Sequence, residues 1–236
     1  MQLVLENVNK KFDDKEVLKE ASFTFEKGKI YGLLGRNGAG KTTLFNCISE
    51  EIKKDSGEIY ILEDGQKKAI DYDRIGFCFS EPKLPDFLTG YEFIKFYIDI
   101  NKEVIKNPLT IDEYFELMQI EKEDRYKLIK GYSQGMKNKL QMLCFIISKP
   151  DIILLDEPLT SLDVVVALEM KNLLKSLKKD HIIIFSTHIL QLATDLCDEI
   201  VLLSKGELEE MDEDIMHSSD FEEKVINALR EDEKNV

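Results

Sequence analysis

The sequence lacks tryptophan and contains no long uncharged run of hydrophobic residues. A transmembrane helix needs about 20 consecutive apolar residues, and the apolar runs here are far shorter. The first residues mix Glu6, Lys10 and Lys11 among apolar side chains, which is not the core of a signal peptide. We therefore expect a chain that neither spans a membrane nor is secreted by the signal-peptide route.

Cysteine is scarce as well. The cysteines are scattered along the chain, and no two of them have the Cys-x-x-Cys spacing of metal or redox sites. Such cysteines are typical of buried, reduced thiols in a reducing compartment. We expect this of Cys47, Cys78, Cys144 and Cys197.

Basic residues are outnumbered, with 32 Lys and Arg against 46 Asp and Glu, and the net charge is −14. The average field of such a chain repels the phosphates of DNA and RNA, so we expect no direct nucleic-acid partner. Apolar residues make up 43% of the 236 positions, which is enough for a substantial core and excludes general disorder.

Short apolar runs bounded by polar turns predict β-strands in both halves of the chain. The later runs are nearly continuous in apolar residues, as is typical of parallel strands covered on both faces. The predicted strands are 3–5, 21–25 and 30–34 in the first half, and 151–155 and 182–185 in the second.

The segment between the two halves, about 85–135, has a helical pattern instead. Thr89 with Glu92, and Thr110 with Glu113, have the spacing of helix-capping boxes. Apolar residues follow them at helical intervals. An inserted helical unit is predicted, and the alternative is a continuation of one α/β domain.

A last helix is predicted near the carboxyl end. Ser219 and Glu222 have the spacing of a cap, and Phe221, Val225 and Leu229 then share one helical face. The acidic residues on either side of this segment are expected to be solvated.

A glycine-rich loop with the pattern G-x-x-x-x-G-K-[ST] begins at Gly35, directly after the predicted strand 30–34. A loop binds a polyphosphate through backbone N–H groups that point inward, and glycines allow the unusual φ/ψ angles that this requires. The positive end of the following helix stabilises the bound phosphates further. Lys41 is expected to reach the β- and γ-phosphates, and the Thr42 hydroxyl to bind Mg²⁺. The expected nucleotide-binding residues of the loop are Gly35, Asn37, Gly38, Ala39, Gly40, Lys41, Thr42 and Thr43.

A phosphate-binding loop alone does not separate an ATPase from a nucleotide kinase or a GTPase. Asp156 and Glu157 follow the predicted buried strand 151–155, and ligands bind at the carboxyl ends of parallel strands. From these positions, we expect Asp156 to help bind Mg²⁺ and Glu157 to polarise an attacking water.

With these motifs in this order, the chain resembles the nucleotide-binding domain of ABC transporters over residues 3–206. Such domains carry a signature, Leu-Ser-Gly-Gly-Gln, ahead of the acidic strand, and this chain has Tyr-Ser-Gln-Gly-Met at 132–136. Ser133 and Gly135 match the signature. The resemblance implies that they contact the γ-phosphate of a nucleotide held by the other subunit of a dimer.

The resemblance also assigns other positions. Residues 161–163, Ser-Leu-Asp, resemble the dimer-contact loop, and His188 resembles the histidine that hydrogen-bonds the γ-phosphate. Phe12 stands where the family has an aromatic residue that stacks on adenine, and a core phenylalanine is the alternative. His181 and His217 lie in polar surroundings and are expected at the surface.

One position departs from the family pattern. Where members usually have a glutamine that senses Mg²⁺ and the attacking water, this chain has Ser80 followed by Glu81. Glu81, or a water held by Ser80, could take that role, or the site communicates differently with its partner. Ser80 therefore joins Thr42 and Asp156 among the expected metal-site residues.

The resemblance implies an α/β fold: a P-loop NTPase with a mixed or parallel sheet core, an antiparallel β subdomain and an inserted helical subdomain. We expect 1–84 and 136–206 to form the RecA-like catalytic core with its β subdomain. Residues 85–135 would form the helical subdomain with the signature loop, and 207–236 an acidic extension.

The implied function is an ATPase that uses ATP and Mg²⁺ and dimerises around two MgATP, either with itself or with a different ABC ATPase. It would drive a separate transmembrane permease from the cytoplasmic face of the cell membrane. The short helical segment and the Ser-x-Gly-Met-Lys variant resemble bacterial drug, peptide or lipid exporters, which favours export.

Two other functions compete with this one. The first is an ATP-switched binding module that works without a membrane partner. The second is a scaffold that has lost hydrolysis, as the missing glutamine and the altered signature suggest. The second is opposed by the intact Lys41, Thr42, Asp156, Glu157 and His188.

Overall fold

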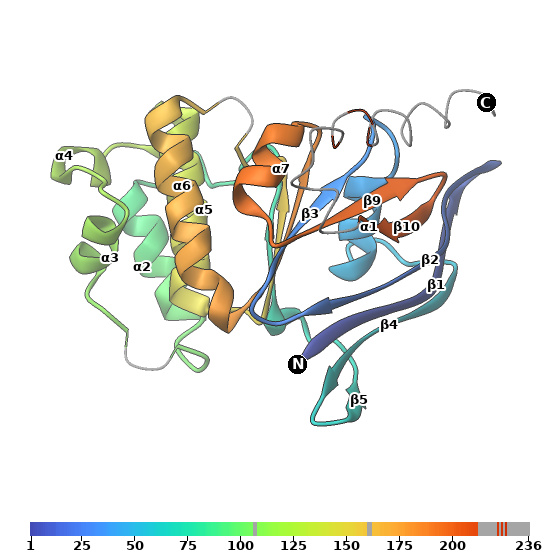
Figure 1. The fold of residues 1–236 in the computed structure, drawn as a ribbon. Helices are drawn as coiled ribbons and strands as arrows, with labels where there is room; N and C mark the ends of the chain where they lie inside the picture. The colour runs from blue at the N-terminus through green and yellow to red at the C-terminus, as the bar shows by residue number, and fades with distance from the viewer. Residues whose placement is uncertain (106–107, 160–161, 212–220, 222, 224, 226–236) are drawn as a thin grey trace.

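The computed structural model describes residues 1–105, 108–159, 162–211, 221, 223 and 225, with only the backbone described for Tyr72. At its centre lies a six-stranded sheet in which every pairing is parallel except that of β10 at one edge (Figure 1). In spatial order the strands are β10 (Glu207–Glu210), β9 (Glu199–Ser204), β3 (Ile30–Leu34), β8 (Ile182–Thr187), β7 (Ile152–Asp156) and β6 (Ile75–Cys78).

The central sheet is buried on both faces, because successive side chains of a strand point to opposite sides. In β7, Ile153 and Leu155 belong to one hydrophobic core, and Ile152 and Leu154 belong to another on the opposite face. This arrangement confirms the prediction made from the nearly continuous apolar runs. The covering helices are α1 (Lys41–Ile48) on one face, and α5 (Gln134–Ser148), α6 (Val164–Leu177) and α7 (Leu190–Leu196) on the other.

A second, antiparallel sheet shares a hydrophobic core with α1 and with β3. Its strands, in spatial order, are β2 (Lys15–Glu26), β1 (Gln2–Phe12), β4 (Ser56–Glu63) and β5 (Gln66–Lys68). The β1–β2 hairpin extends well beyond the predicted strands 3–5 and 21–25, because backbone pairing continues through its polar residues. The backbone N–H of Lys19 donates to the Gly206 carbonyl at 2.8 Å and so ties the hairpin to the β9–β10 turn.

The segment between β6 and α5 is helical, as predicted, and lies on the side of α5 away from the antiparallel sheet (Figure 1). Both predicted capping boxes are present, at Thr89 with Glu92 and at Thr110 with Glu113. The helices here are α2 (Gly90–Ile100), α3 (Ile111–Leu117) and α4 (Lys122–Arg125). Short 3₁₀ helices occur at Tyr72–Arg74, Ile129–Gly131 and Lys178–Asp180.

His181 is buried, so the surface position predicted for it is wrong. The polar residues before it form a 3₁₀ turn, and His181 lies between that turn and β8. Its Nδ1 lies 2.5 Å from the carbonyl oxygen of Pro150. Burial lowers the pKa of the His181 imidazole, against an opposing effect of the Pro150 contact. His217 lies outside the described residues.

The cysteines are all free, as predicted, with Cys47, Cys78 and Cys144 buried and Cys197 half-buried. Desolvation raises the pKa of the Cys47 thiol to about 11 and that of Cys78 to about 12, and it also raises the pKa values of Cys144 and Cys197. These side chains therefore stay protonated at neutral pH and pack as small apolar groups. In the described part of the chain, no helix combines the length and the apolar character that crossing a membrane requires.

The predicted carboxyl-terminal helix is only partly within the described residues. Phe221 and Val225 are buried in a small core with residues of β3 and β9. Ser219, Glu222 and Leu229 lie outside the described residues.

We expect Gly57→Ala to destabilise the fold by about 3 kcal/mol. Gly57 has φ +84°, and an added Cβ would lie 2.2 Å from the carbonyl oxygen of Asn7 on the neighbouring strand, so the backbone would have to move. Gly65 is the matched control, because it has φ +73° with nothing within 4 Å of an added Cβ. Gly65→Ala should cost only about 1–2 kcal/mol. Denaturant unfolding measures both, and equal losses would contradict the clash.

Candidate active site

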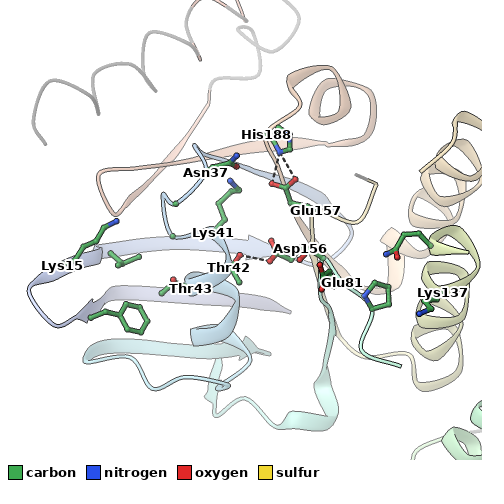
Figure 2. Close-up of a pocket in the computed structure, with 17 residues that line it drawn as sticks. Lys15, Asn37, Lys41, Thr42, Thr43, Glu81, Lys137, Asp156, Glu157 and His188 are labelled. Atoms are coloured by element: carbon green, nitrogen blue, oxygen red, sulfur yellow. Dashed lines mark hydrogen bonds and ion pairs between the residues drawn. The ribbon is translucent and has the colours of Figure 1, made fainter. Parts of the chain in front are cut away.

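A cleft of about 1110 Å³ opens at the carboxyl ends of β3, β7 and β8 (Figure 2). This is where a parallel sheet places its ligands. The glycine-rich loop follows β3, Asp156 ends β7, and His188 comes directly after β8. The topology therefore brings the three separately predicted motifs to one edge of the sheet.

The glycine-rich loop ends at Gly40, which precedes α1 with φ +107°. A Cβ at this position would lie 2.8 Å from Cγ1 of Val17, so the loop conformation requires glycine. Lys41 begins the helix and is buried, and its Nζ donates to the Gly35 carbonyl at 2.7 Å and to the Arg36 carbonyl at 3.2 Å. The ammonium group therefore already points back into the loop.

Burial lowers the pKa of Lys41, and the nearby Glu157 and Asp156 act in the opposite direction. A cation in a buried site of low dielectric interacts more strongly with an incoming anion than an exposed lysine does. The position is suited to phosphate groups entering the cleft.

Asp156 connects the loop to the sheet. Its Oδ2 accepts a hydrogen bond from Thr42 Oγ1 at 2.7 Å (Figure 2). Its Oδ1 accepts a second one from Ser186 Oγ at 2.6 Å. Hydroxyl and carboxylate oxygens side by side are the hard donors that Mg²⁺ takes, usually only one or two from protein while it keeps several waters. The Thr42 and Asp156 donors therefore fit Mg²⁺.

Glu157 stands just beyond β7 with φ +51°, an uncommon conformation for a residue with a side chain. Its carboxylate oxygens lie 2.9 and 2.8 Å from Nδ1 of His188, as Figure 2 shows. A carboxylate and an imidazole in hydrogen-bond contact form an acid–base pair at the mouth of the cleft. The sequence predicted both residues but not their direct contact.

Phe12 lines the rim of the cleft and is 47% exposed, so it is not a core phenylalanine. Ser80 and Glu81, which replace the usual glutamine, line the opposite wall and are both exposed. Thr43 and most of the predicted loop residues also line the cleft.

Several lining residues were missed by the sequence analysis. Lys15 and Val17 reach the cleft from the start of β2, and a longer predicted hairpin would have indicated them. Pro82 follows Glu81 in the segment between β6 and α2, and Gln134 and Lys137 lie in the first turn of α5. Each is next to a predicted motif, but neither motif indicates that these side chains face the cleft.

The signature segment forms the start of α5. Ser133 is the residue before the helix, and its Oγ accepts a hydrogen bond from the Met136 backbone N–H at 3.2 Å. Ser133 is exposed, and Gly135 is half-buried. Of the predicted dimer-contact loop, Ser161 lies outside the described residues, whereas Asp163 caps α6.

Comparison with known proteins shows the family of the chain. Residues 18–160 match the family model described as ABC transporter. The chain is 30% identical to the uncharacterized ABC transporter ATP-binding protein YdbJ of Bacillus subtilis, over 98% of this chain and 75% of that protein. It is 31% identical to the bacitracin transport ATP-binding protein BcrA of Enterococcus faecalis, over 87% and 67%.

A solved structure gives the same result. The putative ABC transporter ATP-binding protein from Pyrococcus furiosus matches with a TM-score of 0.72 at 26% identity, over 86% of this chain and 98% of that one. The chain therefore belongs to the ABC transporter family, in which it is an ATP-binding ABC ATPase. The predicted family and fold class are confirmed.

We expect Ser186→Ala to lower the free energy of unfolding by about 2–3 kcal/mol. The fully buried Ser186 hydroxyl donates to Asp156 and accepts the backbone N–H of Glu157 at 3.0 Å, and alanine removes both contacts. Ser176, an exposed serine whose Oγ donates to the Leu173 carbonyl, is the control. Ser176→Ala should change stability by less than about 0.5 kcal/mol. A similar small change at Ser186 would show that Asp156 does not depend on it.

Proposed function

We propose that this protein is the ATP-binding and ATP-hydrolysing subunit of an ABC exporter, which dimerises around two MgATP and powers a separate transmembrane permease. The observation that carries the proposal is the convergence of Lys41, the Thr42–Asp156 pair and the Glu157–His188 pair in one cleft. These are the groups that phosphoryl transfer to water requires: a phosphate-binding cation, metal ligands and a base for the water.

Nucleotide binding would begin at the glycine-rich loop. The backbone N–H groups of residues 38–42 and the Lys41 ammonium would hold the phosphates, and Thr42 with Asp156 would hold Mg²⁺. The ion supplies charge neutralisation between the phosphates when it is bound. Phe12 at the exposed rim would stack on the adenine ring.

Hydrolysis would use the acid–base pair at the mouth of the cleft. The Glu157 carboxylate would orient the attacking water and accept its proton as the water oxygen bonds to the γ-phosphorus. The bond from the γ-phosphorus to the bridging oxygen would break in the same reaction, and ADP and phosphate would leave. His188 is in contact with that carboxylate through Nδ1 and would keep it oriented. When it is protonated, His188 also presents its second ring N–H to the γ-phosphate.

The signature segment would act on a second subunit. Ser133 and the N–H of Gly135 stand at the amino-terminal end of the 15-residue helix α5, where an anion is favoured. We propose that they contact the γ-phosphate held by the partner, in a homodimer or in a heterodimer with another ABC ATPase. In this proposal 85–135 forms a helical subdomain, 1–84 and 136–206 form the catalytic core, and 207–236 forms an acidic extension.

Export through a permease is the finer part of the proposal. It is supported by the similarity to BcrA, whose name assigns it to bacitracin transport. The ATPase would then lie on the cytoplasmic face of the cell membrane, held there by the permease. The test is co-purification in detergent with any membrane protein that is encoded beside it, together with ATP-dependent transport in vesicles. An ATPase that binds no membrane protein would support the ATP-switched binding module instead.

We expect Lys41→Ala to abolish useful MgATP binding, because the loop loses the one ammonium directed at the β- and γ-phosphates. Nucleotide titration measures the loss. Lys53, an exposed lysine outside the cleft, is the matched control, because Lys53→Ala removes the same charge from the chain. Equal affinity in the two variants would refute the phosphate-binding role of Lys41.

We expect Glu157→Gln to retain ATP binding and to lose about 10²–10⁴-fold in hydrolysis rate, because an amide cannot accept the proton of water. Size-exclusion chromatography with MgATP should then show a persistent dimer. Glu81→Gln, made in parallel, tests the other glutamate that lines the cleft. Normal turnover by Glu157→Gln, with loss in Glu81→Gln, would move the base to Glu81.

A further inference from the structure

Asn138 is a buried polar residue in the second turn of α5, and it is only 6% exposed. Buried amides need hydrogen-bond partners, and both ends of this one have them. Its Nδ2 donates to the carbonyl oxygen of Pro158 at 3.3 Å, and its Oδ1 accepts from Gln134 Nε2 at 3.4 Å. The side chain therefore joins α5 to the segment that follows β7.

That segment carries Glu157, directly before Pro158. Glu157 has φ +51°, a conformation that costs energy in a residue with a side chain and persists only when its surroundings hold it. On one side, its backbone N–H donates to Ser186 Oγ on β8 at 3.0 Å. On the other side, the Asn138 contact fixes the Pro158 carbonyl. The backbone of Glu157 is thus held between a strand and a helix.

Gln134 sets the orientation of the Asn138 amide. Because Gln134 donates to Oδ1, the amide nitrogen of Asn138 is the end that faces Pro158. The two residues are four apart on one helix face, where such side-chain pairs form. Gln134 also lines the cleft and stands where the family signature has glycine, which has no side chain to make this contact.

We propose that Asn138 is a positioning residue for ATP hydrolysis, which fixes Glu157 through the Pro158 carbonyl and links its orientation to the first turn of α5. The proposal rests on the role of Glu157 proposed above. Asn138 is not among the residues that line the cleft, so it would act through Glu157. Gln134 donates a hydrogen bond to Asn138. The residue that departs from the family signature at position 134 therefore also helps to hold Glu157 in place.

The test compares variants at one position in the full-length protein. Asn138→Leu removes both hydrogen bonds at similar volume, and Asn138→Asp keeps the shape but cannot donate when ionised. We expect kcat to fall about 5- to 20-fold in both, as the loss of one positioning hydrogen bond implies. The affinity for MgATP, from titration, should stay within twofold, because the phosphate-binding groups are untouched.

Asn138→Gln separates positioning from packing, because its longer side chain still carries an amide donor. We expect it to keep severalfold more activity than Asn138→Asp. Gln134→Ala should lower kcat less than Asn138→Leu does, because the Asn138 amide keeps its donor. Asn172, an exposed asparagine on α6, is the control, and Asn172→Leu and Asn172→Asp should leave kcat unchanged.

Thermal unfolding of every variant shows whether a loss in rate reflects the site or the fold. A lower kcat in folded Asn138→Leu or Asn138→Asp, with unchanged MgATP affinity, supports the proposal. A kcat within twofold of wild type in both variants overturns it, as does a rate loss that follows the loss of thermal stability. Glu157→Gln is measured in parallel: if it hydrolyses ATP normally, the proposed function itself fails, independently of Asn138.

Discussion

The Asp156 carboxylate is the contact on which the geometry of the cleft depends. It ends β7, accepts one hydrogen bond from Thr42 on α1, and accepts another from Ser186 on β8. A single side chain thus fixes three elements relative to one another at the edge where phosphates would enter. Charge-assisted hydrogen bonds in a buried site are among the strongest that a protein makes, so this arrangement is stable before any ligand binds.

Helix α5 contacts both walls of the cleft. Asn138 reaches the segment after β7, and Gln141, one turn further on, accepts a hydrogen bond from the Cys78 thiol at the end of β6 at 3.0 Å. Burial raises the pKa of Cys78 to about 12, so the thiol remains a donor. A shift of α5 would therefore move the segment that carries Glu157 and the end of β6 that precedes Ser80 together.

Local patterns predicted most of the residues that line the cleft, whereas contacts between distant segments were not predictable. The glycine-rich loop, Asp156 with Glu157, and the capping boxes at Thr89 and Thr110 depend on residues close in sequence. The burial of His181 was missed, because its polar neighbours give no hint of the Pro150 carbonyl beside it in space. The same holds for the bond between Asn138 and Pro158, which no periodicity encodes.

The attachment of the β1–β2 hairpin has a consequence for how the cleft meets a nucleobase. The hairpin carries Phe12, packs Val17 against the backbone of Gly40, and is bound through Lys19 to the β9–β10 turn. The wall beside the proposed position of the base is thus built during folding and would need no ordering when a ligand arrives. Preorganisation of this kind spares the entropy of immobilising a loop, so more of the contact energy is retained as affinity.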